Sequence, residues 1–257
     1  MRYGKATGFF GLVLLLGAAC STSGGSKTDG GGKTDGGASA ADGASPASDG
    51  TVPGTDGGAA TSTNLALLGR SVTEGWFAHW EAEGSYSRGR FYLQHNIWEP
   101  YDPDVQRWPE QVAAVIKAFP GKAGGRKLRA LQYKHCFVDF TDDTDLTPYK
   151  RIAEAVYKEV VTNAKLKLIV GNALPWTTAG MSATIKKKQL EWNAYLADLA
   201  AKHPGEVFVF DQYAVLTDSA GALKAEYAVA ADDAHLNKAG YDALDAAYFA
   251  FLARTLP

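Results

Sequence analysis

The chain has 257 residues, of which 46% are hydrophobic, with 26 Lys and Arg against 28 Asp and Glu. Proteins that bind nucleic acid usually carry clustered basic charge, so this near balance gives no reason to expect a nucleic-acid partner. The sequence has no group of Cys and His residues at metal-ligand spacing, and we predict no metal site.

The first twenty residues have the three parts of a signal peptide. Arg2 and Lys5 are basic, the run FFGLVLLLGAA at 9–19 is apolar but shorter than the about 20 residues that span a bilayer, and Cys20 follows. Cys20 resembles the acylated cysteine of the bacterial lipobox, although Gly17 stands where that motif usually has Leu. We therefore expect a lipoprotein, with palmitate among the fatty acids on Cys20, that is anchored to a membrane outside the cytoplasm, in the bacterial cell envelope. The alternative is a soluble exported protein, cut after the small residues before this cysteine.

The segment that follows the cysteine is a linker. Residues 21–62 are almost entirely Gly, Ser, Thr, Ala and Asp, and Val52 is their only large apolar residue, so they cannot bury a core. A Gly-rich coil of this length has a root-mean-square span of roughly 35 Å. We therefore divide the chain into a signal peptide at 1–20, this disordered linker and one globular domain at 63–257.

Strands and helices alternate along the domain. Apolar runs predict four strands, at 64–69, 128–140, 166–170 and 207–210. Amphipathic spacing and capping residues predict helices that begin at Ser71 and that cover 109–119, 148–165, 183–203 and 240–256.

This alternation predicts an α/β fold, a three-layer α/β/α sandwich with a mainly parallel sheet. Pro120 and Gly121 are expected to end the second helix, and residues 81–104, rich in Gly, Tyr and Trp, to be irregular. In such folds the ligand site lies beyond the carboxyl ends of the strands.

Two motifs fall at that edge. Gly69-Arg70-Ser71 follows the first strand, and Asp232-Asp233-Ala234-His235 precedes the last helix. A serine hydroxyl becomes a nucleophile when a base takes its proton, and an imidazole can do this near neutral pH. The imidazole needs a carboxylate on its other nitrogen, and Asp232 lies three residues before His235. The amides at the start of the first helix would stabilise an oxyanion.

These motifs resemble those of the SGNH (GDSL-like) hydrolase superfamily. His235 is followed by Asn237 and then by Gly240-Tyr241 at the start of the last helix, which strengthens the resemblance. The resemblance implies the flavodoxin-like SGNH fold, with Ser71 as nucleophile, His235 as base and Asp232 as its orienting acid. It also implies hydrolysis of esters of carbohydrates, lipids or small acyl groups, with no cofactor. We expect a serine esterase or acyl hydrolase whose partner is an ester substrate, an acylated glycan or another ester of the envelope.

The sequence departs from the family at two motifs. Arg70 replaces the usual Asp of Gly-Asp-Ser, and the Gly-x-Asn-Asp motif, which supplies an oxyanion donor, is replaced by KHCFVD at 134–139. Lys134 as a cation, or Asn172 through its amide, could act as a donor in its place. The family's second-block glycine, which donates through its backbone N–H, is matched by Gly89.

Other interpretations stay open. Ser71 with Glu74 also forms a capping box, and without catalysis the fold could serve as a surface lipoprotein that binds polysaccharide. The aromatic residues that follow the first motif would either line a sugar-binding face or pack against the sheet; they are Trp76, Trp80, Tyr86, Tyr92, Trp98, Tyr101 and Trp108. We interpret His79, His95 and His135 as structural. If Cys20 is acylated, Cys136 is left unpaired, and we expect it to be an inert buried thiol.

Overall fold

The computed structural model describes residues 62–69, 71–96 and 107–256. Cys20, the linker before Ser62 and Arg70 lie outside the described residues, as do Trp98 and Tyr101. Among the helices that are described, none combines the length and the hydrophobicity needed to cross a membrane.

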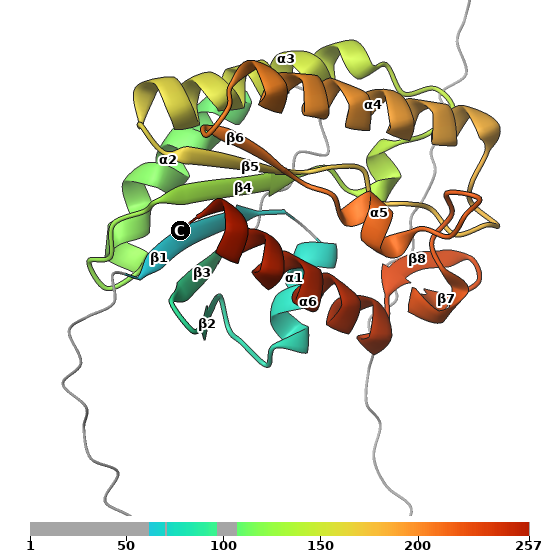
Figure 1. The fold of residues 1–257 in the computed structure, drawn as a ribbon, viewed down its shortest axis with the longest axis horizontal. Coiled ribbons are helices and arrows are strands. Elements are labelled where there is room, and N and C mark those ends of the chain that lie inside the picture. Colours follow the sequence, from blue (N-terminus) through green and yellow to red (C-terminus); the bar gives the residue numbers. More distant parts are fainter. Residues whose placement is uncertain (1–61, 70, 97–106, 257) are drawn as a thin grey trace, which may run out of the picture. The chain divides into compact units, whose positions relative to one another are not determined.

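A six-stranded sheet with the order β2-β3-β1-β4-β5-β6 forms the centre of the domain (Figure 1). All neighbouring strands are parallel except β2 and β3, which form an antiparallel hairpin. The strands are β1 (Thr63–Leu68), β2 (Ser85–Arg88), β3 (Phe91–Asn96), β4 (Ala130–Lys134), β5 (Lys167–Gly171) and β6 (Val207–Phe210).

Helices cover both faces of this sheet (Figure 1). One face packs against α2 (Arg107–Lys122), α3 (Leu146–Tyr157) and α4 (Ala183–Lys202), and the other against α1 (Val72–His79) and α6 (Lys238–Thr255). The remaining elements are η1 (Phe137–Asp139), η2 (Lys158–Asn163), α5 (Gln212–Leu216), η3 (Ala225–Tyr227) and a separate hairpin of β7 (Ala228–Ala230) and β8 (Asp233–Leu236). The predicted α/β fold with a mainly parallel sheet is confirmed.

Strand β1 shows why the apolar runs identify central strands. Leu65 and Leu67 belong to the core beneath α1 and α6, whereas Ala66 and Leu68 belong to the core beneath the other three helices. Successive side chains of a strand point to opposite faces, so a strand covered on both faces is apolar throughout.

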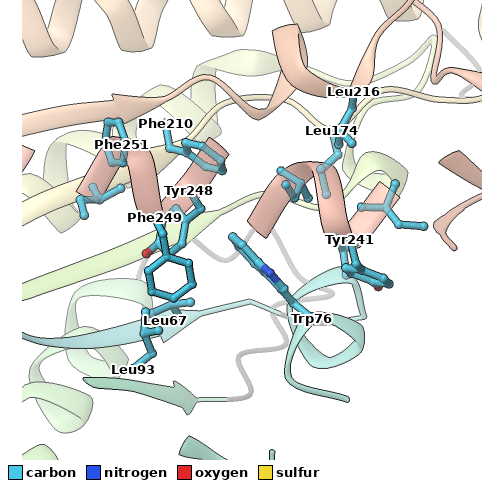
Figure 2. Packing of buried hydrophobic residues seen from close by; sticks show 14 of the residues in the cluster. Leu67, Trp76, Leu93, Leu174, Phe210, Leu216, Tyr241, Tyr248, Phe249 and Phe251 are labelled. Carbon is cyan, nitrogen blue, oxygen red and sulfur yellow. The ribbon is translucent and has the colours of Figure 1, made fainter. Parts of the chain in front are cut away.

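Aromatic side chains join α1, α6 and the sheet (Figure 2). The ring centroids of Trp76 and Tyr248 are 4.8 Å apart, and Trp76 also stacks on Phe210 of β6 at 6.5 Å. Trp80 Nε1 donates a hydrogen bond to Asp245 Oδ1 of α6 at 2.8 Å. These contacts fix α1 against α6.

The structure corrects three boundaries predicted from the sequence. The region 81–104, expected to be irregular, contains β2 and β3, because Phe91 and Leu93 are buried against the α6 face although polar residues interrupt their pattern. Helix α2 continues through Pro120 to Lys122, since a proline in the last turn removes only one backbone hydrogen bond.

The third correction concerns the strand predicted at 128–140, which ends at Lys134. Beyond it, Asp139 Oδ2 accepts a hydrogen bond from Cys136 N at 2.6 Å. This bond folds the chain back into the 3₁₀-helix η1 at the carboxyl edge of the sheet.

Gly75 gives a test of the contact between α1 and α6. A Cβ at this position would lie 2.0 Å from Tyr241 Oη, so the two helices meet where α1 lacks a side chain. Alanine normally stabilises a helix interior by about 1 kcal/mol relative to glycine. We expect the opposite sign here: Gly75→Ala lowers the free energy of unfolding by about 1–3 kcal/mol, measured by urea denaturation, because the added methyl overpacks the contact.

The matched control is the double variant Gly75→Ala/Tyr241→Phe, compared with Tyr241→Phe alone. Removal of the hydroxyl oxygen takes away the closest clash, so Gly75→Ala should cost less in the Tyr241→Phe background. An equal cost in both backgrounds would show that the contact with Tyr241 does not limit residue 75.

Candidate active site

The carboxyl ends of β1 and β4 lie side by side and bring two loops together. Leu68 pairs with Tyr133 in the parallel register, so Ser71 lies just beyond β1 and Cys136 just beyond β4. Ser71 Oγ is 3.4 Å from Cys136 Sγ. The two loops therefore meet at the edge where a ligand site is expected in parallel sheets.

Ser71 has an unusual backbone conformation. Its φ is 32° and its ψ is −76°, in the positive-φ region that residues other than glycine rarely adopt, at a typical cost of about 1–3 kcal/mol. Its carbonyl accepts the first helical hydrogen bond, from Gly75 N at 2.7 Å, but its hydroxyl makes no capping bond. The capping-box interpretation of Ser71 and Glu74 is therefore wrong, because the hydroxyl points to Cys136 and not to the helix amides.

Gly69 allows this turn to form. A Cβ at residue 69 would lie 2.2 Å from Thr73 Oγ1, so any larger residue would displace the first turn of α1. The carbonyl of Gly69 is 3.1 Å from His95 Nε2, and the His95 ring stacks on Phe77 with centroids 5.0 Å apart. His95 thus positions the strand end that precedes Ser71, which is the structural role expected for it.

His235 and its carboxylate partner lie on β8. Asp233 Oδ1 is 2.6 Å from His235 Nδ1 and also accepts the backbone N–H of His235 at 2.9 Å. These hydrogen bonds and the nearby imidazole hold the pKa of Asp233 below its ordinary value, so Asp233 is a carboxylate at neutral pH. With Nδ1 bonded to Asp233, Nε2 is the nitrogen that can act as a base.

In the structure Asp233, and not the predicted Asp232, is hydrogen-bonded to the His235 ring. Asp232 is exposed just before β8, whereas Asp233 is inside the strand. Side chains two residues apart in a strand share a face, so Asp233 and His235 lie together and Asp232 does not. Residues three apart can meet in a loop, but Asp233–Leu236 form a strand.

Ser71 and His235 flank the same turn. Cys136 contacts Ser71, and the ring of the next residue, Phe137, meets the His235 ring edge to face with centroids 5.1 Å apart. Helix α1 also packs against β8. No hydrogen bond joins Ser71 Oγ to His235 among the described residues; the Cys136–Phe137 turn is their shared neighbour.

Of the three predicted oxyanion donors, Lys134 lies closest to the serine loop. It is buried at the end of β4, and a Cβ at Gly69 would be 3.4 Å from Lys134 Cε. Its side chain therefore passes beside Gly69, two residues before Ser71. Lys134 remains the candidate donor.

The structure places Gly89 away from Ser71 and bonds the Asn172 side chain to other residues. Gly89 lies in the turn between β2 and β3, and Phe91 beyond it pairs with Thr63 at the start of β1, so Gly89 is at the amino edge of the sheet, away from Ser71. Asn172 Nδ2 donates to Asp211 Oδ1 at 2.7 Å, and its Oδ1 accepts from the backbone N–H of Tyr213 at 2.9 Å. These bonds direct the Asn172 side chain to the start of α5.

The other histidines and the cysteine have packing roles. His135 is buried, 3.6 Å from Asp139 by their nearest N and O atoms, and packs against Tyr149 and Trp192. His79 Nε2 is 3.2 Å from Asp242 Oδ1. Cys136 is buried, as expected, yet it touches the serine hydroxyl, a contact that spacing alone could not predict.

The described aromatic residues after Ser71 pack inside the domain. Trp76 is 2% exposed, and Trp80 stacks on Tyr86 with centroids 4.3 Å apart while both contact Phe249 of α6. Tyr92 packs edge to face on Phe119 of α2. These contacts favour the packing interpretation over a sugar-binding face; the side chain of Trp108, like Trp98 and Tyr101, lies outside the described residues.

Solved structures share this fold. A Streptococcus pneumoniae protein assigned as a platelet activating factor is 19% identical over 76% of this chain and 86% of its own, with a TM-score of 0.53. A lipolytic protein of the G-D-S-L family from Veillonella parvula is 17% identical over 75% of this chain and 100% of its own, with a TM-score of 0.51. A GDSL-like lipase from Bacteroides thetaiotaomicron is 16% identical over 76% of this chain and 89% of its own, with a TM-score of 0.50. The domain has the SGNH (GDSL-like) hydrolase fold.

These proteins resemble the domain in structure, although only 16–19% of their residues are identical to it. No protein-family model and no curated protein matches the sequence. Within the SGNH fold, Ser71 follows the first strand and His235 precedes the last helix, as the motifs predicted.

The environment of His95 predicts a pH dependence of stability. Burial lowers the pKa of His95 below its ordinary value of 6.5, against the opposing effect of its bond to the Gly69 carbonyl. The unfolded chain then binds this proton more readily, so the contribution of neutral His95 is complete above about pH 6.5 and is lost as the pH falls below it. We expect the free energy of unfolding to fall less between pH 7.5 and pH 5.5 in His95→Gln than in the parent, in urea titrations.

Measurements between pH 7.5 and pH 9 give the internal control. His95 does not titrate there, so parent and variant should differ by a constant amount. Parallel curves across the whole range from pH 5.5 to pH 9 would contradict the assignment.

Proposed function

We propose that this domain is a serine esterase of the SGNH type, with Ser71, His235 and Asp233 as its catalytic residues. The observation that carries the proposal is the strained Ser71 turn and the Asp233–His235 pair on the two sides of the Cys136–Phe137 turn. A strained serine whose hydroxyl is not used for helix capping is typical of a nucleophile at a functional turn.

The reaction is acyl transfer through a covalent intermediate. Ser71 Oγ attacks the ester carbonyl while His235 Nε2 takes its proton, and the same nitrogen returns the proton to the leaving alcohol. Water then hydrolyses the acyl-enzyme by the same steps. Asp233 keeps Nδ1 protonated and stabilises the imidazolium.

The oxyanion requires donors other than the family's asparagine. The backbone N–H of Ser71, at the start of α1, and the ammonium group of Lys134 can supply them. A cation beside the acyl carbon would replace a neutral amide with a charged donor, which forms the stronger hydrogen bond. The chemistry needs no cofactor.

The substrate that we propose is an acylated glycan or another ester of the bacterial envelope. The proposal draws on the predicted lipid anchor at Cys20, which would hold the domain at a membrane outside the cytoplasm. It also draws on the lipases among proteins of this fold, whose substrates are esters.

Serine labelling tests the nucleophile and its base. The full chain should react with a fluorophosphonate probe at Ser71, identified by peptide mass spectrometry, and should hydrolyse a short-chain nitrophenyl ester. Ser71→Ala should abolish both, and His235→Ala should lower the rate by about 10² or more, because the hydroxyl loses its base. A parent that neither labels nor exceeds Ser71→Ala in turnover across a panel of esters would overturn the esterase.

Asp233 and its neighbour Asp232 provide a matched pair of substitutions that tests the third catalytic residue. Asp233→Asn should slow ester hydrolysis by about tenfold or more, since the imidazolium loses its carboxylate, while Asp232→Asn should stay within about twofold of the parent. The Asp233–His235 pair is 43–45% exposed, so water screens it and the effect should be smaller than for a buried pair. A larger loss in Asp232→Asn would reverse the assignment.

Metabolic labelling tests the anchor. In a bacterium that expresses the protein and is fed an alkyne analogue of palmitate, the wild type should carry the label and sediment with membranes. Cys20→Ala should carry none and appear in the soluble fraction. Equal labelling of the two proteins would rule out acylation at Cys20.

A further inference from the structure

A second concave surface lies at the amino edge of the sheet. It has a volume of about 820 Å³ and is lined by the starts of β1, β4, β5 and β6 and by the end of α6. Figure 1 shows the carboxyl terminus beside the start of β1, at the edge opposite to the loops that carry Ser71 and His235. We call this surface the basic groove.

All the charged side chains that line the basic groove are positive. Its lining contains no Asp or Glu but five basic residues, which are Lys127, Arg129, Lys165, Lys167 and Arg254. All five are exposed, and none forms an ion pair with a described residue. Lys167 donates to the Gly205 carbonyl and lies over the Phe208 ring. Its side chain is therefore held against the surface of the groove.

Helix ends explain only part of this charge. Carbonyl groups at the end of a helix attract cations within the last turn. Arg254 occupies such a position in α6, and Lys165 follows the end of η2. Lys127, Arg129 and Lys167 lie in loops or at strand starts, where no helix end requires them. Five like charges at one edge repel one another, and an anionic ligand would relieve this repulsion.

We propose that the basic groove binds the phosphate headgroups of anionic phospholipids and seats the domain on a membrane. Ser62 and Thr63 line the groove, so the segment that carries the predicted anchor joins the domain at this surface. Basic residues on the surface of a membrane-anchored domain add to its affinity for an anionic membrane, because they attract the phosphate groups of the lipids. The proposal shares the membrane location with the proposed anchor but does not depend on the esterase.

This orientation would direct the candidate active site away from the membrane. The strands of the sheet are 4–6 residues long, so the two edges are separated by roughly 15–20 Å. With the amino edge on the headgroups, Ser71 and His235 at the carboxyl edge face esters above the membrane and not the acyl chains within it.

Vesicle binding tests the proposal. The probe protein is the chain from Ser21 to Pro257, which keeps the linker and domain but carries no acyl group, so its binding reports the protein surface alone. It should sediment with vesicles that contain one-third phosphatidylglycerol, should not sediment with pure phosphatidylcholine, and should be released by about 0.5 M salt. Lys127→Glu/Arg129→Glu should weaken the binding at least tenfold.

The matched control is Lys117→Glu/Lys187→Glu, which changes the net charge equally on exposed positions of α2 and α4 outside the groove. It should retain most of the binding, and both double variants should unfold at the temperature of the parent. Equal losses in the two double variants would show a net-charge effect and overturn the groove. Binding to soluble polyphosphate without binding to anionic vesicles would likewise overturn membrane seating and assign the groove to a soluble polyanion.

The same experiment separates this proposal from the proposed function. Lys127→Glu/Arg129→Glu should hydrolyse a soluble nitrophenyl ester at the rate of the parent, because the groove lies at the other edge of the sheet. Loss of vesicle binding with retained hydrolysis supports the groove. Loss of hydrolysis as well would show that the substitutions disturb the whole fold, and the groove assignment would fail.

Discussion

The contact between α1 and α6 is the interaction on which the candidate active site depends. Ser71 begins one of these helices and His235 precedes the other, and the two residues lie far apart in the sequence. Nothing in local geometry brings them together. The aromatic packing of Trp76 on Tyr248 and the bond from Trp80 to Asp245 hold the helices side by side beneath the sheet. The apolar face that stabilises the fold thus also supports the two segments that carry Ser71 and His235.

The turn at Cys136–Phe137 is a second support of the candidate site. In the family this position after the strand carries the asparagine that donates to the oxyanion. Here Asp139 holds the backbone of Cys136, the thiol contacts the serine hydroxyl, and the ring of Phe137 contacts the histidine. The turn therefore places a thiol against Ser71 and an aromatic ring against His235. Under the proposed function, Lys134 in β4, just before this turn, would serve as the oxyanion donor in place of that asparagine.

The sequence predicts the central strands and the motif residues, which depend on patterns along the chain. It does not predict which side chains of a strand share a face, or which distant segments are in contact. The continuous apolar runs identify β1 and β6 because both faces of a central strand are buried. The sequence does not predict strand β3, because Tyr92, Gln94 and His95 interrupt the apolar residues of this segment. The motif spacing finds Ser71 and His235, but the choice between Asp232 and Asp233 depends on whether the segment is a strand or a loop. The positive φ of Ser71 and the thiol beside its hydroxyl follow from tertiary packing, which no local pattern encodes.

The close approach of Gly75 to Tyr241 has a consequence for evolution. The two residues occupy one volume between them, so a lineage can enlarge one only after it has reduced the other. Substitutions at these positions should therefore be correlated among descendants of a common ancestor, whatever happens to the Gly-Asp-Ser triplet. A larger side chain at residue 75 should therefore occur together with a smaller one at residue 241. The shared volume would then couple two positions that are far apart in the sequence and lie on different helices.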